Sequence, residues 1–128
     1  MGKRSAPRAR SSTTGSVSIE AVILVPLFLF AVFITLEGAL WVNASATAMA
    51  AAQDGARAGT YYRGGGPAEG VETAEEIIWA RAVGTNWQVD ADISPQGLTI
   101  TVTGQSLSVI PGLDFPVTKS ATMPWETL

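Results

Sequence analysis

Carboxylates are the side chains of this chain whose spacing could support chemistry. The 128 residues include eleven Asp and Glu but no Cys and no His. A thiol nucleophile, an imidazole base and a disulfide are therefore ruled out, and the usual zinc ligands are missing. This inventory predicts a protein that is not an enzyme, with no catalytic residue, no cofactor and no bound metal.

Two groups of carboxylates are spaced closely enough to suggest a metal site or an acid pair. Glu72, Glu75 and Glu76 cluster at the start of an expected helix, where the helix dipole favours anions. Asp90 and Asp92 are two residues apart in an expected strand, so they share one face. Both patterns are more typical of a solvated helix start and a solvent-facing strand.

Glu20 differs because it stands at the entrance of a long apolar run. The run AVILVPLFLFAVFITL, residues 21–36, carries no charge, and GALWV extends it beyond Glu37 to Val42. At about 1.5 Å per residue, a helix from Ala21 to Val42 spans about 33 Å, enough for a hydrocarbon core of about 30 Å. We predict a transmembrane helix, in which Pro26 is tolerated and can introduce a kink.

The basic residues orient this helix. Four of them precede residue 15, namely Lys3, Arg4, Arg8 and Arg10. Because Lys and Arg favour the cytoplasmic flank, we expect the N-terminus in the cytoplasm and the head outside. Trp41 is either an interfacial aromatic or a residue that packs on a neighbour.

Charge also limits the partners. The formal net charge is −3, and after residue 15 four basic residues face eleven acidic ones. Such an acidic surface is a poor candidate for binding nucleic acid.

A cleavable secretory signal ending at Ala44-Ser45-Ala46 is an alternative to a membrane helix that stays in place. The apolar region of such a signal would normally be only about 7 to 15 residues long, which is shorter than this run.

The helix is expected to continue beyond the membrane to about Gly59, because alanine dominates residues 43–59. Ala46, Ala50, Gly55 and Ala58 could allow close approach of another helix, or simply favour helix formation.

Gly and Pro break the helix at residues 60–70, and a second helix is expected over residues 71–87. Thr73 and Glu76 match a capping box at its start. An apolar face follows from the spacing of Val71, Ala74, Ile78 and Ala82.

From Trp87 the apolar period changes to two. WQVDADI and LTITVT alternate as half-buried strands, and Ser94-Pro95-Gln96-Gly97 between them is typical of a type I turn. The tail FPVTKSATMPW predicts a third strand, at an edge where Pro116 and Pro124 are tolerated. Lys119 is the one charged residue on its apolar face.

The segment GSVSIEAVILVPLFLFAVFITLEGAL, followed by AAQDGARAG, resembles the TadE-like family of tight-adherence (Flp-type) pilus assembly. Members open with a prepilin leader, Gly, a Glu five residues on, an early Pro, a second Glu and an Ala-Arg-rich extension. The resemblance covers residues 15–62 well and residues 98–126 loosely. Ala21 departs from the pattern, because a bulky residue often follows the glutamate.

This resemblance implies that a membrane prepilin peptidase cuts between Gly15 and Ser16. It also implies that Glu20 pairs with the α-amino group of a neighbouring pilin; the alternative is a Glu20 hydrated at headgroup depth. Glu37 is expected to lie at the outer membrane interface without such a partner.

The predicted fold is α+β: a long N-terminal transmembrane helix extending outward, then a short helix packed on a small antiparallel sheet. We expect a basic, disordered leader over residues 1–15, the membrane helix and its extension over 16–62, and the head over 63–128.

The predicted function is that of a minor pilin or pseudopilin in the cell membrane that takes part in pilus assembly. Its expected partners are the prepilin peptidase, other pilins, the assembly platform and the lipid bilayer. One alternative is a single-span, membrane-anchored binding domain unrelated to pili. Another is a secreted domain whose mature chain starts near Thr47.

Overall fold

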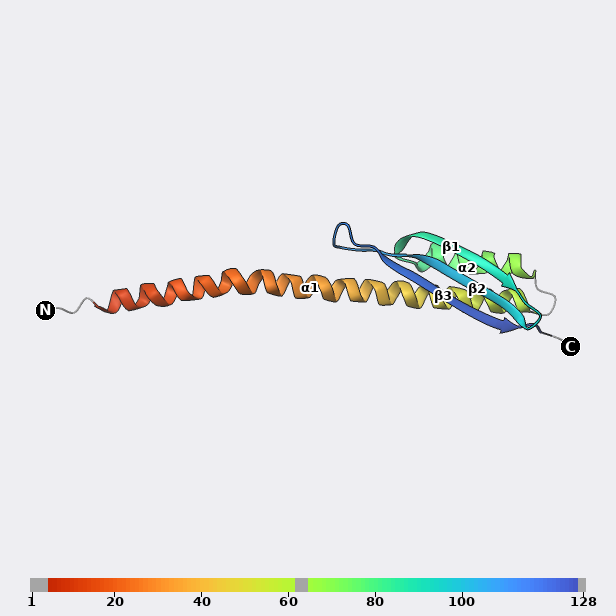
Figure 1. Cartoon of the computed structure of the whole chain (residues 1–128), viewed down its shortest axis with the longest axis horizontal. Coiled ribbons are helices and arrows are strands. Elements are labelled where there is room, and N and C mark those ends of the chain that lie inside the picture. The colour runs from red at the N-terminus through yellow and green to blue at the C-terminus, as the bar shows by residue number, and fades with distance from the viewer. Residues whose placement is uncertain (1–4, 62–64, 127–128) are drawn as a thin grey trace. The chain divides into compact units, whose positions relative to one another are not determined.

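The computed structural model describes residues 5–61 and 65–126, with side chains from Ser18 onward. The chain forms two helices and three strands (Figure 1): α1 (Ser5–Thr60), α2 (Pro67–Arg81), β1 (Gly84–Ile93), β2 (Gly97–Ser106) and β3 (Phe115–Pro124). The predicted α+β fold, with a long N-terminal helix, a short helix and an antiparallel sheet, is confirmed. Two compact units divide the chain, Met1–Thr35 and Leu36–Leu128, so α1 contributes to both.

The start of α1 differs from the prediction. Residues 5–15 were expected to be disordered, but the helix begins at Ser5. Ala and Arg are strong helix formers, and Pro7 lies in the first turn, where its missing N–H leaves no intrahelical bond unmade. Extension of an existing helix also costs less than nucleation of a new one. Residues 1–4 of the basic leader lie outside the described part.

The start of α2 also corrects the prediction. The capping box of Thr73 and Glu76 is wrong, because α2 begins at Pro67 and both residues lie inside it. Proline suits the first helical position, and Gly66 precedes it with a φ of 71°, a conformation that glycine adopts easily. The backbone N–H of Gly65 donates to the carboxylate of Glu69 in the first turn. Residues 62–64 of the expected helix break lie outside the described part.

The end of α2 and the start of β1 also shift. The helix ends at Arg81, where the N–H of Ala82 donates to the carbonyl of Ile78 at 2.9 Å. Residues 84–86, which the sequence assigned to the helix, belong to β1.

The sheet is an antiparallel meander in the order β1-β2-β3. Ile93 faces Leu98 at the first connection, and Ser106 faces Phe115 at the start of the second pairing. The N–H of Gly97 donates to the carbonyl of Ser94 at 3.2 Å, which confirms the predicted turn. β3 is an edge strand, as its prolines predicted.

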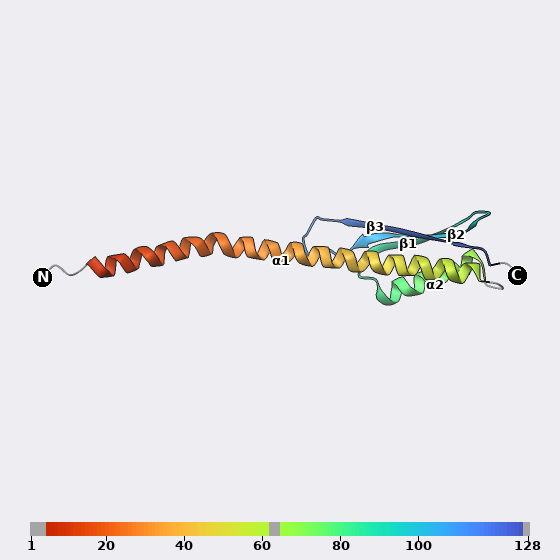
Figure 2. The ribbon, with the colours of Figure 1, turned by 90° about the horizontal axis from the view of Figure 1, so that it is seen from below.

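The core lies on one face of the sheet. Figures 1 and 2 show α2 beside the C-terminal part of α1, with the three strands on one side of this pair. The predicted alternation holds, since Leu98, Ile100 and Val102 are fully buried whereas Asp90 and Asp92 are exposed. Small side chains from both helices complete this core: Ala44, Ala48, Ala51, Ala52 and Ala56 of α1, and Ala74 of α2.

Candidate membrane and assembly site

The apolar part of α1 is the first candidate site. Among the described residues, one helical segment is long and apolar enough to cross a membrane, within Ser18–Thr60. Its most apolar window has a mean hydropathy of 2.6, and none of that window is buried inside the chain. Large side chains such as Val22 and Phe28 are 72% and 68% exposed. An apolar surface of this kind marks a contact with lipid or with other helices.

Within Met1–Thr35, Glu20 lies on α1 with an exposed side chain. Gly15 and Ser16 also lie in α1, but their side chains are outside the described ones. The structure therefore places these three residues on one continuous helix. Cleavage after Gly15 and pairing of Glu20 stay predictions.

The remaining residues predicted for the membrane segment also lie on α1. Ala21 is exposed, Val42 is 59% exposed, and the helix continues without a break through Pro26. Trp41 is 40% exposed, and its Nε1 donates to the carbonyl of Pro116 at 3.3 Å. The indole therefore ties α1 to the start of β3, which matches the packing interpretation of this residue.

Glu37 is buried and hydrogen bonded within its own chain. It is only 6% exposed, and its Oε1 atom accepts hydrogen bonds from the backbone N–H groups of Val109 and Ile110 at 2.5 and 3.0 Å. The Ser108 hydroxyl lies 2.9 Å from the same oxygen. Glu37 therefore binds the segment between β2 and β3 within its own chain. Its location at the outer membrane interface stays a prediction.

The sequence could not reveal these contacts because they join residues more than seventy positions apart. Ionised carboxylates form strong hydrogen bonds with backbone N–H groups, so the contact offsets part of the cost of burial. The second oxygen, Oε2, is buried and has no hydrogen-bond partner among the described residues. In the sequence, the only indication that Glu37 has a partner is that a glutamate occurs inside an apolar run.

The segment that Glu37 binds, residues 107–114, turns at Pro111 and Gly112. The N–H of Leu113 donates to the carbonyl of Ile110 at 3.4 Å, and Gly112 has a φ of 83°. Proline followed by a residue with positive φ is typical of a type II turn. The backbone of this connection therefore has a defined shape.

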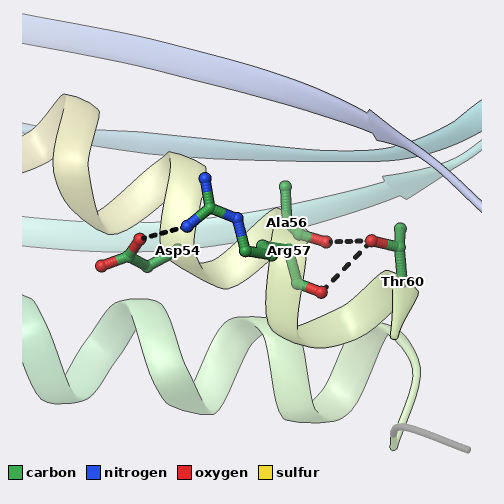
Figure 3. Close-up of polar contacts among 4 residues, drawn as sticks. All are labelled: Asp54, Ala56, Arg57 and Thr60. Carbon is green, nitrogen blue, oxygen red and sulfur yellow. Dashed lines mark hydrogen bonds and ion pairs between the residues drawn. The ribbon is translucent and has the colours of Figure 1, made fainter. Parts of the chain in front are cut away.

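The stretch DGARAG, residues 54–59, forms the far end of α1. Figure 3 shows Arg57 beside Asp54, with Nη1 and Oδ1 3.8 Å apart, and the Thr60 hydroxyl donating to the Ala56 carbonyl at 2.9 Å. Both charged side chains are more than half exposed, so their ion pair contributes little stability. Gly55 and Ala56, the small residues between them, matter more to the packing of the head, because both are buried.

Gly55 is one of these small residues, and it is packed against α2. A Cβ atom on Gly55 would lie 2.6 Å from the carbonyl oxygen of Gly70 and 3.0 Å from the Cβ of Ala74. Gly55 is one of the four small residues predicted to allow close approach of another helix, and the helix that approaches it is α2 of the same chain. Ala46, Ala50 and Ala58 are exposed or half-buried.

A groove of about 540 Å³ lies between α2 and β1. Trp87 forms one wall, and its ring covers the backbone of Gly104, where a Cβ would lie 2.3 Å from the indole. The indole Nε1 is buried without a partner among the described residues. The other lining residues are Glu75, Ile78, Trp79, Ala82, Gly84, Thr85, Asn86 and Val89. Sequence reasoning missed this groove, although Gly104 interrupts the alternating strand pattern.

The acidic groups form no metal site among the residues that the structure describes. Glu72, Glu75 and Glu76 are exposed inside α2 rather than at its start, because the helix begins at Pro67.

Comparison with known proteins supplies one match. Residues 15–57 match the family model described as TadE-like protein. No curated protein and no solved structure matches the chain. The match begins at Gly15, ends at Arg57, and includes Glu20, Pro26 and Glu37. The resemblance inferred from these residues is therefore confirmed: residues 15–57 carry the TadE-like family pattern.

Proposed function

We propose that the protein is a minor pilin or pseudopilin that takes part in assembly of a tight-adherence (Flp-type) pilus. One observation carries the proposal. The family match starts at Gly15 and covers the helix whose large apolar side chains lie uncovered in the described chain. Pilus assembly supplies both partners that such a helix requires, namely a bilayer before assembly and neighbouring helices within a bundle.

Processing is the first step of the proposed role. The basic residues before Gly15 stay in the cytoplasm, and the head lies outside. A membrane prepilin peptidase hydrolyses the bond between Gly15 and Ser16, which removes the leader and leaves an ammonium group on Ser16. Because Glu37 is buried against the head, we place the outer end of the span at Leu36 rather than at Val42. Residues 16–36 cover about 32 Å, close to the thickness of a hydrocarbon core.

Glu20 is the assembly residue in this proposal. An ionised carboxylate inside a membrane costs about 2.5 to 3.5 kcal/mol at the midplane and less near an interface. The ammonium group of a neighbouring processed subunit removes part of that cost. Pairing therefore favours one register between adjacent helices, as buried polar groups do in other helical assemblies.

The proposal is tested by the mature N-terminus. We expect mass spectrometry of the full-length protein, expressed with its prepilin peptidase, to find Ser16 as the first residue. Without the peptidase, the leader should remain. A chain that begins at Met1 or Gly2 under both conditions contradicts the proposal.

The role of Glu20 is tested separately by Glu20→Ala, with Glu69→Ala as a control at an exposed carboxylate of α2. We expect Glu20→Ala to allow cleavage but to weaken co-purification with partner pilins in detergent. The control should leave both unchanged. Equal co-purification of Glu20→Ala and wild type contradicts the pairing role.

A second candidate function is a single-span, membrane-anchored binding domain. The groove between α2 and β1 favours it, because two tryptophans and a carboxylate line an open space of about 540 Å³. This function needs neither cleavage at Gly15 nor Glu20. A chain that retains its leader, combined with binding that Trp79→Ala abolishes, would support it over the pilin.

The structure argues against a secreted domain that starts near Thr47. Such a cut would remove Ala44, which is fully buried in the core, together with Glu37 and Trp41. The head would lose contacts that join α1 to the β2–β3 connection and to β3.

A further inference from the structure

The connection between β2 and β3 exposes an unusual apolar surface. Leu107, Val109 and Leu113 are 45%, 41% and 44% exposed. No charged residue occurs from Leu107 to Leu113, and Asp114 is the first one after them. Residues 107–113 are called the apolar loop below. A loop in contact with water alone would normally be polar, so this composition indicates a partner.

Glu37 fixes where this loop lies. Its carboxylate accepts hydrogen bonds from Val109 and Ile110 of the apolar loop, and it directly follows Leu36, the last residue of the uncharged run. Trp41, one helical turn later, holds Pro116 at the start of β3. The loop is therefore attached to α1 at the point where the uncharged apolar run ends.

We propose that the apolar loop is a second membrane contact, which lies in the interfacial layer of the outer leaflet while Glu37 holds it against α1. Apolar side chains that enter this layer gain the free energy of leaving water. The proposal requires that α1 spans the membrane, but it does not require pilus assembly. Its failure is therefore distinguishable from failure of the proposed function.

The hydrogen bonds of Glu37 fit this location. Backbone N–H groups near a bilayer have few water partners, and each one left unsatisfied is costly. The buried carboxylate satisfies two consecutive N–H groups of the loop, so Val109 and Leu113 can enter the interface without exposing them. The type II turn at Gly112 keeps the loop compact.

Lipid is favoured over another protein because the part of α1 to which the loop is attached also exposes apolar side chains. Leu36 and Val42, which lie on either side of Glu37 along the helix, are 45% and 59% exposed there. The apolar loop adds Leu107, Val109 and Leu113 to these exposed side chains. The aqueous face of the sheet is different, since Thr99 and Thr122 hydrogen bond to each other at 2.6 Å there.

The absence of cysteine from the sequence makes a direct test possible, because one introduced thiol can be labelled uniquely. We would label Leu113→Cys in the full-length protein with a fluorophore and reconstitute it at low protein density in phosphatidylethanolamine and phosphatidylglycerol vesicles. Gln96→Cys is the matched control, because Gln96 is exposed in the turn between β1 and β2. A nitroxide quencher on the lipid headgroups of both leaflets reports how close the label is to the interface, whichever way the protein is inserted in the vesicle.

Quenching at Leu113 should exceed quenching at Gln96 by about twofold or more, as expected for a group at the headgroup boundary. Equal quenching at the two positions would overturn the proposal. A label at Leu113 that is shielded from the headgroup quencher, and is instead self-quenched as protein density rises, would also overturn it, because the loop would then be covered by another copy.

The role of Glu37 is tested in the same vesicles. Glu37→Gln retains an acceptor oxygen and should keep most of the quenching at Leu113, whereas Glu37→Ala should lose the excess over Gln96. Tryptophan fluorescence monitors folding of both variants. If Glu37→Ala is folded and quenching is unchanged, Glu37 does not hold the loop; if it is unfolded, the Leu113 and Gln96 comparison still decides the membrane contact.

Discussion

The two halves of α1 use opposite kinds of side chain. Before Leu36 the helix carries large apolar residues that are exposed, such as Phe28 and Leu29. From Ala44 onward it carries small residues, and those that face the sheet are fully buried. One helix therefore serves two partners: its second half packs on its own chain, whereas its first half requires a partner outside the chain.

The two glutamates at the ends of the apolar run show the same contrast. Glu20 is exposed, whereas Glu37 is buried and accepts hydrogen bonds from two backbone N–H groups. In the sequence both are isolated carboxylates beside apolar residues. The fold gives Glu37 an intramolecular role, and Glu20 is the one of these two that we propose pairs with another subunit.

The largest expected effect comes from making the same substitution in both regions. Leu98→Ala removes a fully buried side chain from the core and should destabilise the head by about 2 to 5 kcal/mol. Leu29→Ala, at a residue 49% exposed in the first half of α1, should change head stability by less than about 0.5 kcal/mol. Denaturant unfolding in detergent, followed by tryptophan fluorescence, measures both. Equal losses of unfolding free energy would contradict the claim that the second half of α1 packs on its own chain and the first half does not.

A smaller effect is expected from adding a methyl group to α1. Gly55→Ala forces the helix away from Gly70 and should destabilise the head by about 1 to 3 kcal/mol. Gly38→Ala is the matched control, because a Cβ there meets nothing within 4 Å. Since alanine favours a helix over glycine by about 1 kcal/mol, the control should be neutral or stabilising. A neutral Gly55→Ala would show that the contact between α1 and α2 is loose in solution.

The smallest effect is expected at the surface of the second half. Arg57→Ala removes the exposed ion pair with Asp54 and should cost less than about 1 kcal/mol. Because salt screens an exposed ion pair, the difference from wild type in unfolding free energy should be smaller in high salt than in low salt. A loss as large as that of Gly55→Ala would mean that Arg57 has another structural role.

Much of this architecture was predictable because it depends on local patterns. The period of two gave the strands around Val89 and Ile100, and the apolar run gave α1. The start of α2 is harder to predict, because Gly66 and Pro67 are typical of a helix break, although proline also favours a first helical turn.

The partners of Gly55 and Glu37 could not be predicted either, and the physical reason is a different one. A small residue allows close approach and a carboxylate accepts hydrogen bonds, but neither property specifies which segment approaches. Gly70 and Val109 are distant in the sequence, so only the fold brings them to these positions. The sequence therefore indicated that contacts would form there but not whether they lay within one chain or between chains.

The central claim, that the first half of α1 binds other subunits, is tested most directly by photo-crosslinking in cells that assemble the pilus. Phe28 and Trp79 are both exposed aromatics, 68% and 87%, so each can be replaced by a photoreactive phenylalanine with little effect on the fold. We predict adducts with small membrane pilins from position 28 and none from position 79. Protein adducts from position 79 alone would contradict this account and favour a binding head.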